Sequence, residues 1–228
     1  MTALAEPVPA KQRDKPRRGR RRGEFGGHVA QTIATLQKGY LGERPAAVTT
    51  MAQLRAAVDR EPGASYAVLD VTSVPDRHLE QWRGDEPTPT ERAKHAALTL
   101  YATHQQSRRD APMHVDDVSL GEAVYRLAHT SDDGDPAARR PAVLRRFATL
   151  GTADTLAQLV HHLRSLVRQL RDAKIPLDYG LLAEDLARFQ RRGGPEDVRA
   201  LWGRDFYRTE LNDQPNGSTQ TPGEETQS

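Results

Sequence analysis

The residues that decide the fold are 152–173, TADTLAQLVHHLRSLVRQLRDA. Apolar side chains recur in this stretch at intervals of three or four positions, namely at Leu156, Leu159, Leu163, Leu166, Val167 and Leu170. This interval places them on one face of an α-helix. Pro176 lacks the amide hydrogen that a continuing helix needs, so the helix is predicted to end before it. The stretch therefore predicts the longest helix of the chain, about six turns long, with one buried face.

Shorter helical patterns flank this stretch. Apolar residues at helical spacing predict further helices at 141–150, at 179–192 and from Pro195 onward. Gly151 and the pair Gly193-Gly194 separate the helices, and glycine is common just beyond a helix end. Because four helices with short connections can enclose one core, we predict a four-helix bundle over residues 136–210.

The N-terminal half also has helical spacing. Candidate helices lie at 28–40, 50–60, 76–82, 88–106 and after Ser119. Thr88 and Glu91 are spaced as a capping box, with Pro89 at the first helical position, and Ser119 begins a similar pattern. Residues 66–71 favour a strand, but no second strand is evident, so an extended or irregular segment is expected there.

These patterns predict an all-α fold with two small helical lobes, residues 25–135 and the bundle at 136–210. Residues 1–24 form a basic arm and residues 211–228 an acidic tail, both rich in proline, glycine and polar residues. Such segments bury too little apolar surface to fold, so both ends are predicted to be disordered.

The net charge of +2 hides an uneven distribution. Residues 1–22 carry eight Lys or Arg against two acidic residues, whereas residues 23–136 carry eleven against seventeen. The balance returns to fourteen against eight in residues 137–208. Two basic blocks around an acidic middle indicate a polyanionic partner, with a solvated charged surface as the alternative.

Basic residues form a row on the helix at 152–173. Arg164, Arg168 and Arg171 fall on one flank, roughly 100° from the centre of the apolar face. A guanidinium group presents several donors in a fixed fork, which suits a phosphate backbone. Further candidate contacts lie near the ends of neighbouring helices, at Arg145, Arg146, Lys174, Arg191 and Arg192. On its own, the row could also be a solubilising flank of the core.

Several classes of protein are disfavoured. There is no cysteine, so disulfides and thiolate metal sites are excluded and a reducing cytoplasm is expected. The histidines do not assemble into a metal-binding pattern, and we find no phosphate-binding loop, nucleophile motif or carboxylate pair for catalysis. No apolar run could span a membrane. We therefore predict a non-catalytic protein without cofactor or metal, and aromatics at 5% favour backbone contacts over base stacking.

Five short segments, in this order and at this spacing, resemble the CasB family, the small subunit of the type I-E CRISPR effector called Cascade. They are Ser119-Leu120-Gly121, Leu144-Arg145-Arg146-Phe147, His162-Leu163-Arg164, Ile175-Pro176-Leu177-Asp178-Tyr179 and Asp185-Leu186-Ala187-Arg188-Phe189. The resemblance covers about residues 25–210 and is dense from about residue 115 onward.

The resemblance implies an all-helical subunit that is present as a pair within the complex, beside other Cascade subunits. It implies backbone contacts with guide RNA and target DNA, support of the displaced strand of the R-loop, and no chemistry. By position, it adds Arg92 to the candidate nucleic-acid contacts and supports Arg145, Arg164, Arg191 and Arg192. Two other functions stay open, a helical transcription regulator and a purely structural helical adaptor.

Overall fold

The structure, a computed structural model, describes residues 20–79, 85–130 and 136–213. Within these ranges it contains α-helices, two short 3-10 turns and one isolated bridge between His114 and Leu177, but no strand. The predicted all-α fold is therefore confirmed. Most of the predicted arm and tail, residues 1–19 and 214–228, lies outside the described residues. Among those described, no helix is both long and apolar enough to cross a membrane.

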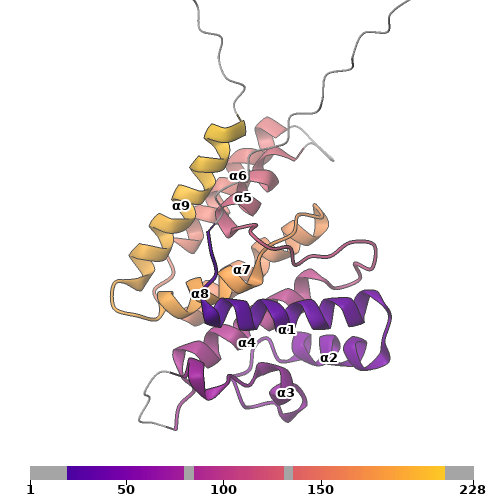
Figure 1. The fold of residues 1–228 in the computed structure, drawn as a ribbon. Helices are drawn as coiled ribbons and strands as arrows, with labels where there is room; N and C mark the ends of the chain where they lie inside the picture. The colour runs from indigo at the N-terminus through magenta and orange to yellow at the C-terminus, as the bar shows by residue number, and fades with distance from the viewer. Residues whose placement is uncertain (1–19, 80–84, 131–135, 214–228) are drawn as a thin grey trace, which may run out of the picture.

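The helices follow one another in the order shown in Figure 1. They are α1 (Glu24–Leu41), α2 (Pro45–Ala56), α3 (Leu69–Thr72), α4 (Pro89–His104), α5 (Leu120–His129), α6 (Pro136–Leu150), α7 (Leu156–Asp172), α8 (Tyr179–Phe189) and α9 (Gly194–Asp213). The 3-10 turns η1 and η2 span Tyr66–Val68 and Asp76–His78. The segment at 66–71, expected to be extended or irregular, contains η1 and the start of α3.

Polar side chains set several helix starts. Thr88 accepts a hydrogen bond from the Glu91 amide while the Glu91 carboxylate accepts one from the Thr88 amide, which confirms the predicted capping box of α4. The Thr155 hydroxyl caps α7. Because of this cap, α7 begins four residues later than predicted and has 17 residues, so the 20-residue α9 is longer. The end of α9 also takes in residues 211–213, which were assigned to the tail.

The predicted apolar face of α7 is buried. Leu159, Leu163, Leu166, Val167 and Leu170 are each at most 1% exposed. This face packs against α4, α5 and α6. The long leucine stripe is therefore an element of the core, which leaves the basic flank of α7 to face outward.

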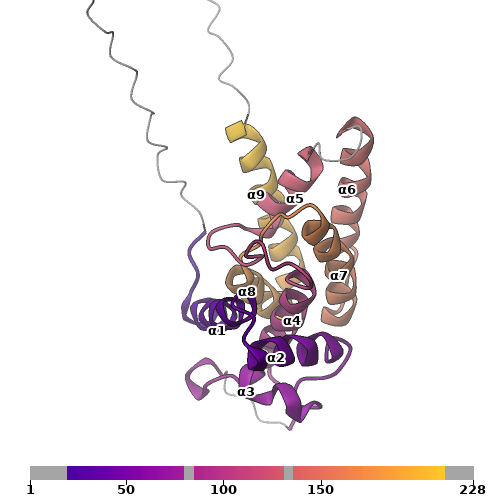
Figure 2. The same ribbon diagram turned by 90° about the vertical axis from the view of Figure 1, so that its right-hand side faces the viewer.

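Both halves of the chain contribute to one connected core. Helix α8 packs against α1 and α4, and α5 packs against α9 and α6. In Figures 1 and 2, α5, α6 and α9 gather at the top and α1, α2 and α3 at the bottom, with α7 and α8 between them. The lobe boundary was predicted in the turn at 132–136, of which residues 132–135 lie outside the described residues, and the division into lobes stays a prediction.

The segment that enters α1 differs from the prediction. Residues 20–24 were assigned to the disordered arm, but Arg20 bonds to both carboxylate oxygens of Asp185, at 2.9 and 2.5 Å, and lies 3.6 Å from Asp205. Arg22 lies 3.4 Å from the buried Asp178. The cause is electrostatic, since a buried carboxylate needs a charged or hydrogen-bonded partner and the chain entering α1 supplies it.

Helix α1 crosses α8 at very close range. A Cβ placed on Gly180 would lie 2.4 Å from the carbonyl oxygen of Gly26, so neither position has room for a side chain. The Glu184 carboxylate accepts hydrogen bonds from the Gly23 and Gly26 amides, at 2.5 and 3.1 Å. Glycine and a carboxylate thus fix the start of α1 against α8.

Candidate nucleic-acid interface

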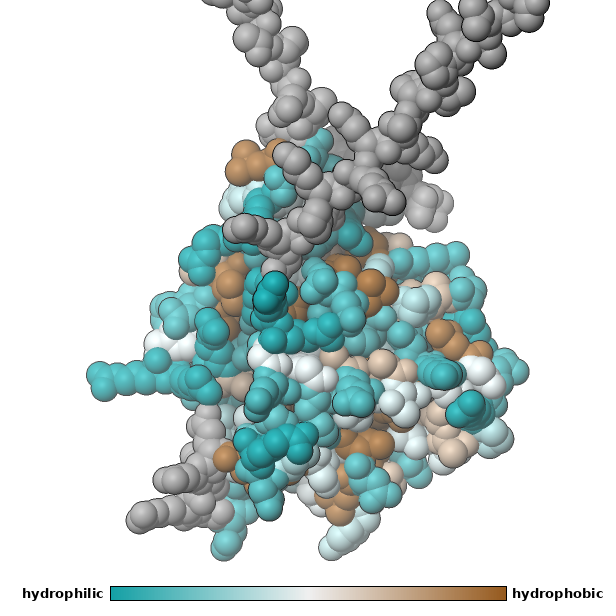
Figure 3. All heavy atoms as spheres, in the orientation of Figure 1, coloured by the Kyte–Doolittle hydropathy of each residue, from teal (hydrophilic) through white to brown (hydrophobic). Residues whose placement is uncertain are grey.

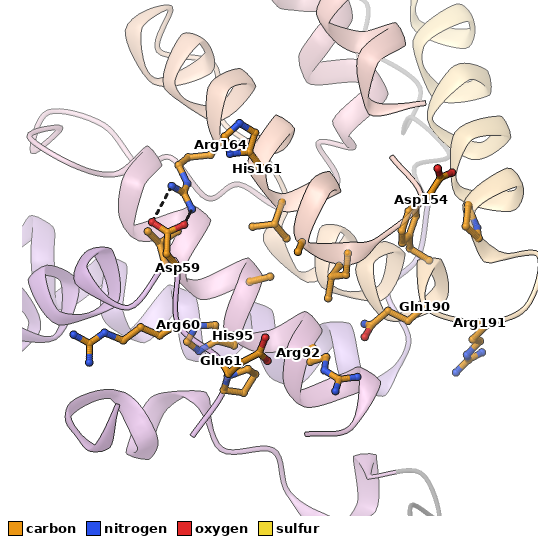
Figure 4. A pocket seen from close by; sticks show the side chains of 18 residues that line it. Asp59, Arg60, Glu61, Arg92, His95, Asp154, His161, Arg164, Gln190 and Arg191 are labelled. Carbon is orange, nitrogen blue, oxygen red and sulfur yellow. Dashed lines mark hydrogen bonds and ion pairs between the residues drawn. The ribbon is translucent and has the colours of Figure 1, made fainter. Parts of the chain in front are cut away.

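An open groove of about 730 Å³ lies mainly between four parts of the chain. Its walls are the residues that follow α2, the first turns of α4, the first half of α7 and the end of α8. Its lining includes four arginines, Arg60, Arg92, Arg164 and Arg191, and three acidic residues, Asp59, Glu61 and Asp154. Apolar side chains, among them Leu156, Val160 and Phe189, lie between the charges. Figure 4 shows this arrangement.

The groove brings together three of the predicted site residues, Arg92, Arg164 and Arg191. They come from α4, from α7 and from the turn after α8. Figure 4 shows the Arg164–Asp59 pair at the upper left, Arg92 near the lower centre and Arg191 at the right. Because these residues are up to about a hundred positions apart in sequence, only the fold could place them in one groove.

Arg164 forms a two-point ion pair with Asp59. Its two terminal nitrogens donate to the two carboxylate oxygens, at 3.2 and 2.5 Å. The Arg164 side chain is 17% exposed, whereas that of Asp59 is 76% exposed. The hydrogen bond from Arg164 lowers the pKa of Asp59, so the carboxylate stays charged at neutral pH. In this structure an acidic residue therefore occupies the donor fork that was predicted to bind phosphate.

The other two predicted groove arginines are more exposed to solvent than Arg164. Arg92 lies 3.3 Å from Glu86, an exposed residue, and its own side chain is 30% exposed. Arg191 is exposed in the turn after α8, beside the equally exposed Arg192. Surface ion pairs of this kind are worth little, so a phosphate could replace Glu86 at Arg92 at small cost.

Beyond the groove, the remaining basic residues at the end of α7 differ in their exposure and in their acidic partners. Arg168 is exposed, but Arg171 donates to Asp172 at 3.0 and 3.1 Å. Lys174 lies 3.6 Å from Asp110 and has a φ of 55°, in the left-handed region. Residues in that conformation terminate helices, so Lys174 has a structural position in addition to its charge.

Arg145 and Arg146 do not line the groove. Both are exposed on α6. The nine predicted contacts therefore divide into four sets. Three line the groove, Arg168 and Arg171 lie further along α7 with Lys174 just beyond its end, two lie on α6, and Arg192 is next to the groove. Figure 3, in the orientation of Figure 1, shows a surface that is mostly hydrophilic, with small separate apolar patches.

Arg60 and His161 line the groove but were not among the predicted contacts. Arg60 lies in the Asp59-Arg60-Glu61 sequence, where alternating charges give no sign of a binding site. His161 extends the basic flank of the helix at 152–173. Its position one turn before Arg164 could have identified it as a groove residue from the sequence. The ion pairs of Arg20 with buried carboxylates were also not predicted, because Arg20 lies in an arginine-rich segment whose composition is typical of disorder.

Two buried titratable residues, His104 and Lys94, do not line the groove. His104 is completely buried and shares a hydrogen bond of 2.9 Å with the Tyr179 hydroxyl. Burial lowers the pKa of His104 to about 3. Lys94, at 2% exposure, donates to the carbonyl of Ser73 at 2.6 Å, and burial lowers its pKa to about 8. Across residues 20–79, 85–130 and 136–213, no group of three His, Asp or Glu side chains is placed to hold a metal ion.

Comparison with known proteins identifies the family. The sequence model of the family described as CRISPR-associated protein Cse2 matches residues 50–207. The crystal structure of CasB from Thermobifida fusca is 37% identical, with a TM-score of 0.66, over 82% of this chain and 99% of that one. A search of curated protein sequences finds no match.

Two more distant structures share the fold. A chain of a CRISPR RNA-guided surveillance complex has a TM-score of 0.62 at 23% identity, over 82% of this chain and 96% of its own length. A Cse2-family protein from Thermus thermophilus has a TM-score of 0.56 at 22% identity, over 80% and 97%. The fold and the groove define an all-helical protein with a surface groove lined by both basic and acidic residues. The chain belongs to the CRISPR-associated Cse2 family, which includes CasB, and the resemblance noted in the sequence is confirmed.

Proposed function

We propose that this chain is the non-catalytic small subunit of a type I-E Cascade-like complex. In this role it binds the backbones of guide RNA and target DNA and stabilises the R-loop, including its displaced strand. Membership of the Cse2 family supports the assignment, as does the shared fold of a chain from a CRISPR RNA-guided surveillance complex. Its partners would be the nucleic acids, other subunits and a second copy of itself, in the cytoplasm.

The observation that carries the proposal is the meeting of Arg92, Arg164 and Arg191 in one open groove. Guanidinium groups from separate elements, spread along a channel, can follow a phosphate backbone without reading its sequence. An R-loop exchanges one duplex for another of similar stability, so a few such contacts can tip the balance. Arg145, Arg146, Arg168 and Arg192 are exposed and would extend the contact surface.

The test measures binding of the isolated chain to single-stranded and double-stranded oligonucleotides over a range of salt. We expect weak binding without sequence preference and a log–log salt slope of about −0.7 to −0.9 per phosphate contact. The double variant Arg92→Gln/Arg191→Gln should bind more weakly and with a shallower slope. Affinity that is independent of salt, or confined to one sequence, would contradict the proposal.

One observation favours a structural adaptor as the second candidate. Arg92, Arg164, Arg171 and Lys174 each have a carboxylate within 4 Å inside the chain itself. If these pairs are permanent, the arginines decorate the surface and the partner is protein. In that case the Arg92→Gln/Arg191→Gln variant would bind oligonucleotides as the wild type does, because these arginines would play no part in nucleic-acid binding.

A further inference from the structure

We propose that Asp59 gates the groove by occupying the donor fork of Arg164 until a nucleic-acid phosphate displaces it. This inference rests on the proposed function, because it concerns how the same groove receives its ligand. It assigns a role to Asp59, an acidic residue outside the basic set, and it explains why one of the central arginines is paired with a carboxylate of its own chain.

The geometry of the pair is that of a phosphate contact. Both terminal nitrogens of Arg164 donate, one to each oxygen of Asp59. Carboxylate and phosphate oxygens accept the same two parallel hydrogen bonds from a guanidinium group. The Asp59 carboxylate thus stands in the place where two phosphate oxygens would bind.

The exposure of the two partners allows exchange. Arg164 is held in the groove wall with its side chain 17% exposed, and its Nε atom is buried without a hydrogen-bond partner. Asp59 is 76% exposed and lies after the end of α2, outside any helix. The arginine is therefore fixed, whereas the carboxylate is on the solvent side, where water solvates it once a phosphate has taken its place at the guanidinium group.

A phosphate can take the place of the carboxylate at Arg164. The incoming phosphate oxygens accept the same two hydrogen bonds, and water solvates the released Asp59 carboxylate well. While Asp59 is in place, it neutralises Arg164 and repels an incoming phosphate. The gate would therefore lower the affinity of the groove for isolated phosphates, and favour a backbone that also reaches Arg92 and Arg191.

Asp59→Asn tests the gate because it removes the charge with little change in volume. Full-length wild type and variant are compared for binding of a fluorescent 20-nucleotide oligodeoxythymidine at fixed salt. We expect Asp59→Asn to bind about three to ten times more tightly, through loss of the competing pair and of the repulsion. The matched control is Glu61→Gln, which removes an acid from the same groove without freeing the fork of Arg164 and should raise affinity less than Asp59→Asn does.

Two further variants separate the outcomes. In an Arg164→Gln background, Asp59→Asn should give no gain, since the fork that it frees is gone. An equal gain in both backgrounds, or a gain no larger than that of Glu61→Gln, would mean a general charge effect and overturn the gate. If Arg164→Gln weakens binding but Asp59→Asn changes nothing, the gate is wrong and the proposed function stands. If neither Arg164→Gln nor Asp59→Asn alters binding, the groove does not bind nucleic acid. That result would contradict both the gate and the proposed function.

Discussion

Arg20 donates to both carboxylate oxygens of Asp185, at 2.9 and 2.5 Å, although the two residues are 165 positions apart. Asp185 also accepts a hydrogen bond from the Trp202 indole at 2.7 Å, so α8, α9 and the segment entering α1 meet at one buried carboxylate. The side chains of Arg20 and Asp185 are only 16% and 2% exposed. This pair connects the N-terminal segment to the core.

We expect Arg20→Ala to destabilise the fold by roughly 3–5 kcal/mol, because it leaves a buried carboxylate without its cation. Urea unfolding measures the change. Arg21→Ala is the matched control, since Arg21 is the next residue and is exposed, and it should cost less than about 0.5 kcal/mol. Equal unfolding midpoints for the two variants would show that the Arg20 pair does not stabilise the protein.

A second prediction concerns the contact between α1 and α8. Gly180→Ala should cost about 1–3 kcal/mol, because its Cβ would lie 2.4 Å from the Gly26 carbonyl and force the helices apart. Gly27→Ala, with no atom within 4 Å of its Cβ, should instead stabilise α1 by about 0.5–1 kcal/mol. Thermal melting of both variants checks the contact, and a harmless Gly180→Ala would contradict it.

A third prediction follows from His104. Its pKa is lowered to about 3 by burial, against about 6.5 in the unfolded chain, so the unfolded state binds the extra proton between these values. The contribution of His104 is therefore fully present above about pH 6.5 and is lost as the pH falls. Between pH 7 and pH 5 it should remove roughly 2 kcal/mol of the free energy of unfolding. His104→Gln should lose less stability over this interval than wild type does, as urea titrations at both pH values would reveal. The same loss in both proteins would exclude His104 as the cause.

The parts of the fold that depend on local pattern could be predicted from the sequence. The apolar face of α7 followed from the spacing of Leu159, Leu163 and Leu170, and the start of α4 from the capping box at Thr88. The true start of α7 was missed because Thr155 can equally well continue a helix or cap one, and only the observed hydrogen bond decides.

The parts that depend on distant contacts could not be predicted. The arginine-rich composition around Arg20 is typical of disorder, and nothing local shows that its partners are the buried Asp185 and Asp205. Likewise, the spacing along one helix identifies Arg164 as a basic flank residue but cannot show that Asp59 pairs with it. Runs of basic residues in the sequence thus predict where cations lie, whereas the fold determines which of them are available to bind a nucleic-acid partner.

The central claim is that the groove arginines hold nucleic-acid backbone within the assembled complex. Its most direct test is the dissociation rate of target DNA from reconstituted effector that carries Arg92→Gln/Arg191→Gln in this subunit. Arg188→Gln/Arg204→Gln is the matched control, because it removes two exposed arginines that do not line the groove. We predict normal assembly of both effectors and faster target dissociation, with a shallower salt dependence, for the groove variant alone. Equal dissociation rates for wild type, groove variant and control, at every salt concentration, would contradict the account.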